Sequence, residues 1–123
     1  APCAGRVVRR ENDLPDQRVP ERDRERLPGN HVLLRCGDFE VLFAHLQRGS
    51  VRVAPGETVS PGTLLGVVGN SGNTSEPHLH LHAQRPGPPD APFAGDPLPL
   101  RIDGRWLVRN DRIEGRDWAG SSD

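Results

Sequence analysis

The sequence predicts an all-β domain: a twisted antiparallel sheet or barrel-like sandwich of about eight strands. Glycine and proline are frequent, with 14 and 13 of the 123 residues, which is typical of short strands joined by many turns. Apolar residues occur in short runs between turn signals, and we assign no helix. A chain of this length with 33% hydrophobic residues builds one core. We therefore expect a single domain at residues 1–109 and a C-terminal tail at 110–123.

The first half of the chain contains a β-hairpin. Residues 1–10 form a turn followed by a short strand. Residues 11–28 hold ten charged residues and three prolines without apolar periodicity, so we expect a long exposed loop. Two strands follow at 31–36 and 39–46. The Gly37–Asp38 pair between them predicts a two-residue hairpin turn.

The second half of the chain consists of shorter strands between proline-rich loops. Strand patterns occur at 51–53, 63–68, 78–83, 100–102 and 105–109. Pro-Gly pairs mark the turns around the first two strands. Residues 69–77, rich in Gly, Asn and Ser, form a loop, and the proline-rich segment 85–99 is a surface connector.

The composition excludes several functions. All 16 basic residues are arginine, so Schiff-base chemistry, lipoyl or biotinyl attachment and a P-loop lysine are excluded. A net charge of −1 gives no electrostatic case for nucleic-acid binding. No apolar run approaches the 18 or more residues of a membrane span. The sequence contains no methionine, and we expect the chain to be a processed or excised part of a longer product.

Three histidines share one face of a predicted strand. His78, His80 and His82 are two residues apart, so their side chains point the same way at a spacing of about 6.6 Å. A single histidine on a strand is most often structural, but three on one face indicate a site. His45 is a fourth candidate, because it is the only polar residue between Val41 and Leu46.

Clustered imidazoles suit metal-assisted hydrolysis. A catalytic zinc ion takes three protein ligands and keeps one position open. Zinc polarises a substrate carbonyl and lowers the pKa of water toward 7. An unligated imidazole nearby, with a pKa near 6.5, transfers protons at neutral pH. The His-x-His pattern alone is a weak motif, and it gains weight from the Gly/Asn/Ser loop before it.

Five segments resemble, in order and spacing, the lysostaphin-type (LytM-type) zinc metallopeptidases. The resemblance extends over residues 1–84, with a weaker match to 109. The segments are Ala1-Pro-Cys-Ala-Gly-Arg-Val-Val8, Gly29-Asn-His-Val-Leu-Leu34, Leu42-Phe-Ala-His-Leu46, Val51-Arg-Val-Ala-Pro-Gly-Glu-Thr-Val-Ser-Pro-Gly-Thr-Leu-Leu-Gly66 and Val68-Gly-Asn-Ser-Gly-Asn-Thr-Ser-Glu-Pro-His-Leu-His80.

The resemblance implies a function and a role for each histidine. It implies a zinc groove on a twisted antiparallel sheet, hydrolysis of peptide bonds in peptidoglycan cross-bridges or stem peptides, and a secreted, periplasmic or cell-envelope bacterial protein. His80 matches the zinc ligand, and His78 and His45 match the two catalytic histidines. His82 falls at a position with no inherited role, and His31 is expected to be structural.

One departure from the family pattern bears on activity. The family's other two zinc ligands, a His and an Asp four residues apart, lie upstream of the Ala-Pro-x-x-Gly segment with which this sequence starts, and no His-x-x-x-Asp occurs in the sequence. Either these ligands lie outside this chain, or the protein is a degenerate, non-catalytic regulator of wall hydrolases or a wall-binding module. We prefer the first, because the three matched histidines are retained. A phosphohistidine carrier, a related barrel with two facing histidines, is the third alternative.

The two cysteines are expected to lie close together. If Val7 pairs with Val32 in an antiparallel ladder, the same register places Cys3 opposite Cys36. We expect a disulfide or a close thiol pair, and a disulfide would fit an exported protein.

Overall fold

The computed structural model describes residues 1–17, 28–72, 74, 78–99, 101–102 and 105–106. Across these residues it contains eight strands and no helix, so the all-β prediction is confirmed. The strands are β1 (Gly5–Glu11), β2 (Asn30–Cys36), β3 (Phe39–Leu46), β4 (Thr58–Val59), β5 (His80–Gln84), β6 (Pro97–Leu98), β7 (Arg101–Ile102) and β8 (Arg105–Trp106).

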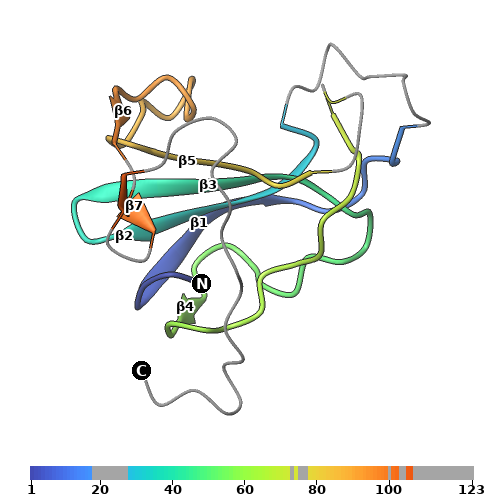
Figure 1. Ribbon diagram of the computed structural model, residues 1–123, viewed down its shortest axis with the longest axis horizontal. Coiled ribbons are helices and arrows are strands. Elements are labelled where there is room, and N and C mark those ends of the chain that lie inside the picture. The colour runs from blue at the N-terminus through green and yellow to red at the C-terminus, as the bar shows by residue number, and fades with distance from the viewer. Residues whose placement is uncertain (18–27, 73, 75–77, 100, 103–104, 107–123) are drawn as a thin grey trace.

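Six strands form one antiparallel sheet in the order β4-β1-β2-β3-β5-β6, and β7 pairs with β8 in a separate two-stranded sheet. Figure 1 shows β1, β2, β3 and β5 side by side as a twisted layer. The six-stranded sheet is not closed, because β4 and β6 are its edges. The barrel form of the predicted fold is therefore not the one that the described residues adopt.

Both faces of the sheet centre are apolar. On one face, Val7, Leu34 and Val41 pack with Val51 and Leu65 from the loops that follow β3. On the other face a smaller cluster forms from Leu33, Leu42 and Ala44, against which Phe93 of the proline-rich connector packs. This two-sided burial explains why β2 contains a continuous apolar run at its centre rather than an alternating pattern.

The predicted hairpin is confirmed: β2 and β3 pair antiparallel across a turn at Gly37–Asp38. Gly37 has a φ of 71°, which the turn requires and glycine adopts without steric cost. The predicted pairing of 100–102 with 105–109 is observed for β7 and β8, over the residues described.

The strands predicted at 51–53 and 63–68 are not formed. These segments touch each other through one backbone bond from Arg52 to the Leu65 carbonyl, and Val68 forms an isolated bridge with Leu46. Their apolar residues are explained by burial against the sheet, not by a ladder. The short edge strands β4 and β6 were not predicted, and β5 begins at His80 rather than at His78.

The first residues of the long charged loop contact the body of the domain. Asp16 forms an isolated antiparallel β-bridge with Ser71, and the Gln17 backbone N–H donates to the Asn70 carbonyl. Residues 18–27 of this loop and the predicted tail at 110–123 lie outside the described residues.

Cys3 and Cys36 form a disulfide with a Cα–Cα distance of 6.0 Å, as expected. The register used to predict it was wrong, because Val7 pairs with Leu34 and not with Val32. A bulge in β1 follows between Val7 and Arg9. Cys3 instead precedes β1 and reaches Cys36 from outside the ladder. Gly5 makes room for this approach, since a Cβ there would lie 3.0 Å from the Cys3 sulfur.

Candidate active site

A β-bulge near the end of β3 brings His45 to the histidine face of the sheet. Ala44 pairs with His80, so regular alternation would turn His45 to the opposite face. The β2–β3 register shifts between Asn30 and Val32, where two residues of β3 oppose one of β2. His45 there has a φ of 62°, the one positive value among the described non-glycine residues.

Three hydrogen bonds hold His45 in this unusual conformation. Its backbone N–H donates to the Pro28 carbonyl at 2.9 Å, and its carbonyl accepts the Gly69 N–H at 3.0 Å. Its ring Nδ1 lies 2.8 Å from the Ser71 carbonyl oxygen. A carbonyl only accepts, so Nδ1 carries the proton and Nε2 of the neutral ring keeps a lone pair.

Ser71 and Asn30 fix the loop that positions His45. Both residues are fully buried. The Ser71 hydroxyl donates to the Leu46 carbonyl at 2.6 Å and accepts the Asn30 N–H at 2.9 Å. The sequence analysis did not single out these residues. The only signal was the Gly69-Asn-Ser-Gly72 segment, whose backbone geometry cannot be derived from composition.

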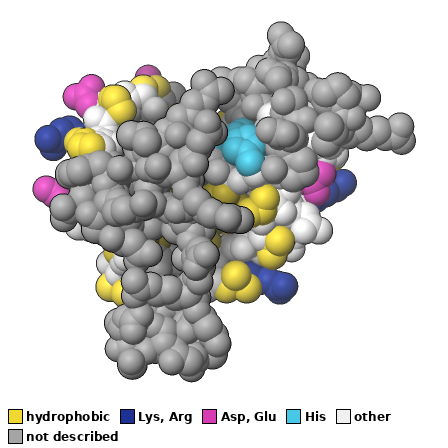
Figure 2. All heavy atoms as spheres, viewed as in Figure 1, with side chains coloured by type: hydrophobic (Ala, Val, Ile, Leu, Met, Phe, Trp, Pro, Cys, Tyr) yellow, Lys and Arg dark blue, Asp and Glu magenta, His cyan; other side chains and the backbone are white. Residues whose placement is uncertain are grey.

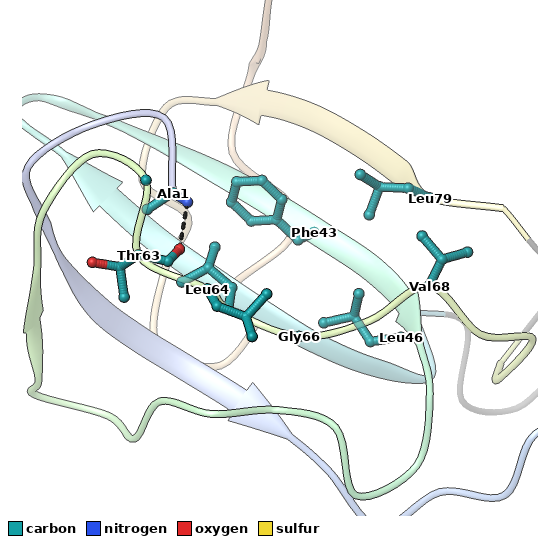
Figure 3. A pocket seen from close by; sticks show the side chains of 10 residues that line it. Ala1, Phe43, Leu46, Thr63, Leu64, Gly66, Val68 and Leu79 are labelled. Carbon is teal, nitrogen blue, oxygen red and sulfur yellow. Dashed lines mark hydrogen bonds between the residues drawn. The ribbon is translucent and has the colours of Figure 1, made fainter. Parts of the chain in front are cut away.

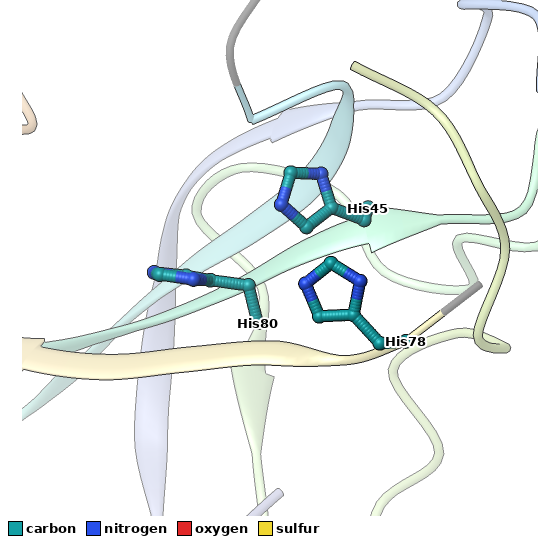
Figure 4. Close-up of side chains that lie close together, drawn as sticks. All are labelled: His45, His78 and His80. Carbon is teal, nitrogen blue, oxygen red and sulfur yellow. The ribbon is translucent and has the colours of Figure 1, made fainter. Parts of the chain in front are cut away.

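Figure 4 shows that His78, from the loop before β5, and His80, at the start of β5, lie beside His45. The ring centroids of His45 and His78 are 4.8 Å apart, and those of His45 and His80 are 5.8 Å apart. His78 Nδ1 lies 3.0 Å from the Thr74 hydroxyl. The structure thus brings together the three histidines that the sequence singled out as site residues. His31 lies outside this group, buried edge-on against Phe93.

The environment keeps two of the three histidines neutral. Burial lowers the pKa of His45, and this outweighs the opposing effect of the bond to the Ser71 carbonyl. Partial desolvation, followed by the proximity of the other imidazoles, lowers the pKa of His80, although its side chain still reaches solvent. Neutral imidazole is the form that binds a metal ion and accepts a proton.

The three side chains fit a metal ion as a set of imidazole donors. Their ligand nitrogens lie within 4.8 Å of one another, and the group contains no carboxylate among the described residues. Two imidazoles on one tetrahedral zinc ion have nitrogens about 3.4 Å apart, given bonds of about 2.0–2.1 Å. An ion bound to one of the exposed imidazoles, His78 or His80, would therefore have the other imidazoles close beside it.

The histidine face is open to solvent. In the space-filling view, histidine atoms reach the surface beside hydrophobic side chains (Figure 2). A separate apolar pocket, shown in Figure 3, lies between the sheet and the loops after β3, and its walls include Phe43, Leu64, Val68 and Leu79. None of the described residues that line this pocket is a histidine or carries a carboxylate, so we place the chemistry at the histidine cluster.

Comparison with known proteins relates the chain to a peptidase family. The model of peptidase family M23 matches residues 1–92. Endolysin 2638A of Staphylococcus phage 2638A is 39% identical over 57 residues, covering 46% of this chain and 12% of the endolysin. An uncharacterized metalloprotease of Haemophilus influenzae is 31% identical over 77 residues, covering 62% of this chain and 15% of that protein.

Solved structures share the fold. The catalytic domain of the prophage-encoded M23 protein EnpA from Enterococcus faecalis has a TM-score of 0.58 at 22% identity, covering 80% of this chain and 62% of that one. LytU has a TM-score of 0.54 at 24% identity, covering 75% and 56%. A zinc-containing peptidase from Vibrio cholerae has a TM-score of 0.51 at 20% identity, covering 66% and 21%. The chain spans less than a sixth of the length of the curated relatives it matches.

Proposed function

We propose, on the premise that this chain belongs to peptidase family M23, that its histidine cluster is part of a metal-dependent site that hydrolyses peptide bonds of bacterial peptidoglycan. The observation that carries the proposal is the bulge at His45, which adds a third imidazole to the pair on and beside β5. Bulges next to functional sites commonly redirect a side chain in this way.

His80 is assigned as the metal ligand. Its exposed imidazole at the start of β5 is kept neutral by its surroundings. A bound zinc ion supplies Lewis acidity, which polarises a carbonyl and makes water a better nucleophile at neutral pH. The resemblance to lysostaphin-type peptidases implies a further His and Asp ligand, which this sequence does not supply in the expected spacing.

His45 and His78 are assigned to proton transfer. Because Nδ1 of His45 donates to the Ser71 carbonyl, its Nε2 is free to take a proton from the attacking water and return it to the leaving amine. His78 lies next to it. An N–H of the His78 ring can donate a hydrogen bond to the oxyanion that develops on the substrate carbonyl.

The substrate that fits this chemistry is a peptidoglycan cross-bridge or stem peptide, and the site of action is the cell wall or another extracellular location. An endolysin among the relatives supports this assignment. In the described part of the chain, no helix is long and apolar enough to cross a membrane.

A second candidate is a non-catalytic wall-binding or regulatory domain. The specific observation in its favour is that the described cluster contains three histidines and no carboxylate. The match to a peptidase family favours both candidates over a phosphohistidine carrier.

Metal content and peptidoglycan hydrolysis separate the two candidates. Zinc per chain is measured by elemental analysis after dialysis, and release of soluble fragments from purified peptidoglycan is followed in parallel. Both are also measured for a longer product that includes the preceding segment. We expect His80→Ala to lose zinc, and His45→Gln to keep zinc but lose hydrolysis.

His31→Gln is the matched control, since it also replaces a histidine by glutamine and His31 lies outside the cluster, against Phe93. This variant should behave as the wild type in both assays. Absence of zinc and of hydrolysis from both lengths of protein would contradict the peptidase and favour the non-catalytic domain.

A further inference from the structure

A chain of hydrogen bonds runs along the histidine face of β5, away from the three-histidine cluster. Nε2 of His80 lies 2.9 Å from Nδ1 of His82, and Nε2 of His82 lies 3.1 Å from the Gln84 side-chain oxygen. The Gln84 amide nitrogen donates to the Pro92 carbonyl at 2.8 Å. The four residues therefore form one continuous row of polar contacts.

The far end of this row determines the direction of each bond. The Pro92 carbonyl only accepts, so Gln84 must turn its NH₂ toward it and its oxygen toward His82. That oxygen also only accepts, so Nε2 of His82 carries a proton. With His82 neutral, its Nδ1 is then an acceptor, and the bond to it takes the proton of His80 Nε2.

We propose that His82 is a positioning residue for His80: it holds the Nε2–H of His80, so that Nδ1 is the nitrogen with which His80 binds a metal ion. This inference rests on the proposed function. Such partners of metal-binding histidines set the tautomer and ring orientation, and their loss typically costs 10- to 100-fold in metal affinity.

The burial of these residues suits a support for an exposed ligand. His80 is exposed, His82 is half-buried and Gln84 is 1% exposed. Gln84 also pairs with Glu40 of β3 and Pro97 of β6, in the body of the sheet. These hydrogen bonds attach the exposed His80 side chain to the buried Gln84, and so restrict His80 to one rotamer where it would otherwise sample several.

The first test is direct observation of the bond by NMR on protein labelled with ¹⁵N at histidine. We expect a scalar coupling between Nε2 of His80 and Nδ1 of His82 in the metal-free wild type at pH 8. On addition of Zn²⁺, the chemical shift of His80 Nδ1 should move while the coupling persists. A missing coupling, or binding through Nε2 of His80, would overturn the proposal.

The second test is Co²⁺ affinity, measured by its visible absorption. His82→Phe keeps a ring of similar size without an acceptor, and it should bind Co²⁺ about 10- to 100-fold more weakly. His82→Asn places an oxygen near the position of Nδ1 and should recover most of the affinity. His31→Gln is again the control, and thermal unfolding checks that each variant is folded.

The positioning role of His82 and the metal site itself can be refuted separately. If the wild type binds Co²⁺ and His82→Phe binds it equally well, the positioning role is wrong and the proposed function stands. If the wild type and a longer product bind no Co²⁺, the proposed metal site is wrong and the positioning role falls with it.

Discussion

Replacing Ser71 by alanine should destabilise the domain markedly, although it removes a single oxygen atom. The hydroxyl accepts the Asn30 N–H and donates to the Leu46 carbonyl, in a fully buried position. The Leu46 carbonyl keeps a second donor, the Asn30 side-chain amide at 3.2 Å, so this loss costs about 1 kcal/mol. The Asn30 N–H loses its hydroxyl acceptor, which costs about 1–3 kcal/mol more.

The expected loss in the free energy of unfolding is therefore about 2–4 kcal/mol. For a chain of 123 residues each kcal/mol lowers the Tm by about 4 °C, so thermal unfolding followed by circular dichroism should show a fall of about 8–16 °C. Ser60→Ala is the control, because Ser60 is exposed and its loss should change stability by less than about 0.5 kcal/mol. A Ser71→Ala variant as stable as this control would refute the view that the hydroxyl secures the loop beneath His45.

Three further predictions concern the same framework. Gly29→Ala should destabilise the domain more than Gly56→Ala in the same assay. Both glycines have a positive φ, but only a Cβ at Gly29 would collide with Ser71. Equal losses in the free energy of unfolding would be inconsistent with this packing. Reducing the Cys3–Cys36 disulfide, which has a sequence separation of 33, should lower the free energy of unfolding by about 4 kcal/mol, and an unchanged urea midpoint with reductant would argue against it. Burial lowers the pKa of His31, so the unfolded chain takes up the proton more readily, and stability should fall as the pH drops below about 6.5. His31→Gln should weaken this fall between pH 7 and 5, and identical pH profiles would exclude His31 as a contributor.

The parts of the fold that the sequence predicted are those set by local patterns. The apolar run of β2, the Gly37–Asp38 turn and the strand up to Leu46 specify the hairpin within seventeen residues. The strict alternation likewise predicted that His80 and His82 share a side, and their rings are in contact along β5. His78, predicted on the same strand, lies in the loop before it. Short edge strands such as β4 have no such local pattern. Its two residues form a strand only because they pair with residues of β1 that lie more than fifty residues away in the sequence.

The part that local patterns could not predict is the direction of His45. Because Ala44 pairs with His80, regular alternation would turn His45 to the opposite face. In the sequence His45 was a candidate only as the one polar residue of an apolar run and through the resemblance to a known family. The bulge that reverses its direction arises from the pairing of β3 with β2 and from contacts with Pro28, Gly69 and Ser71. The disulfide shows the same limit, since Val7 pairs with Leu34 and not with Val32, and no local pattern distinguishes these two registers.

The conformation of His45 also explains why this site needs so much support from residues that carry no chemistry. A non-glycine residue at a φ of 62° costs about 1–3 kcal/mol. Three hydrogen bonds to His45, each with a net contribution of about 0.5–1.5 kcal/mol, are enough to offset that cost. Because one of them also fixes the ring nitrogen that carries the proton, the same contacts that sustain the strained backbone leave Nε2 ready to accept a proton. Stability and function are thus coupled at this residue, and a weakened Ser71 loop should affect both.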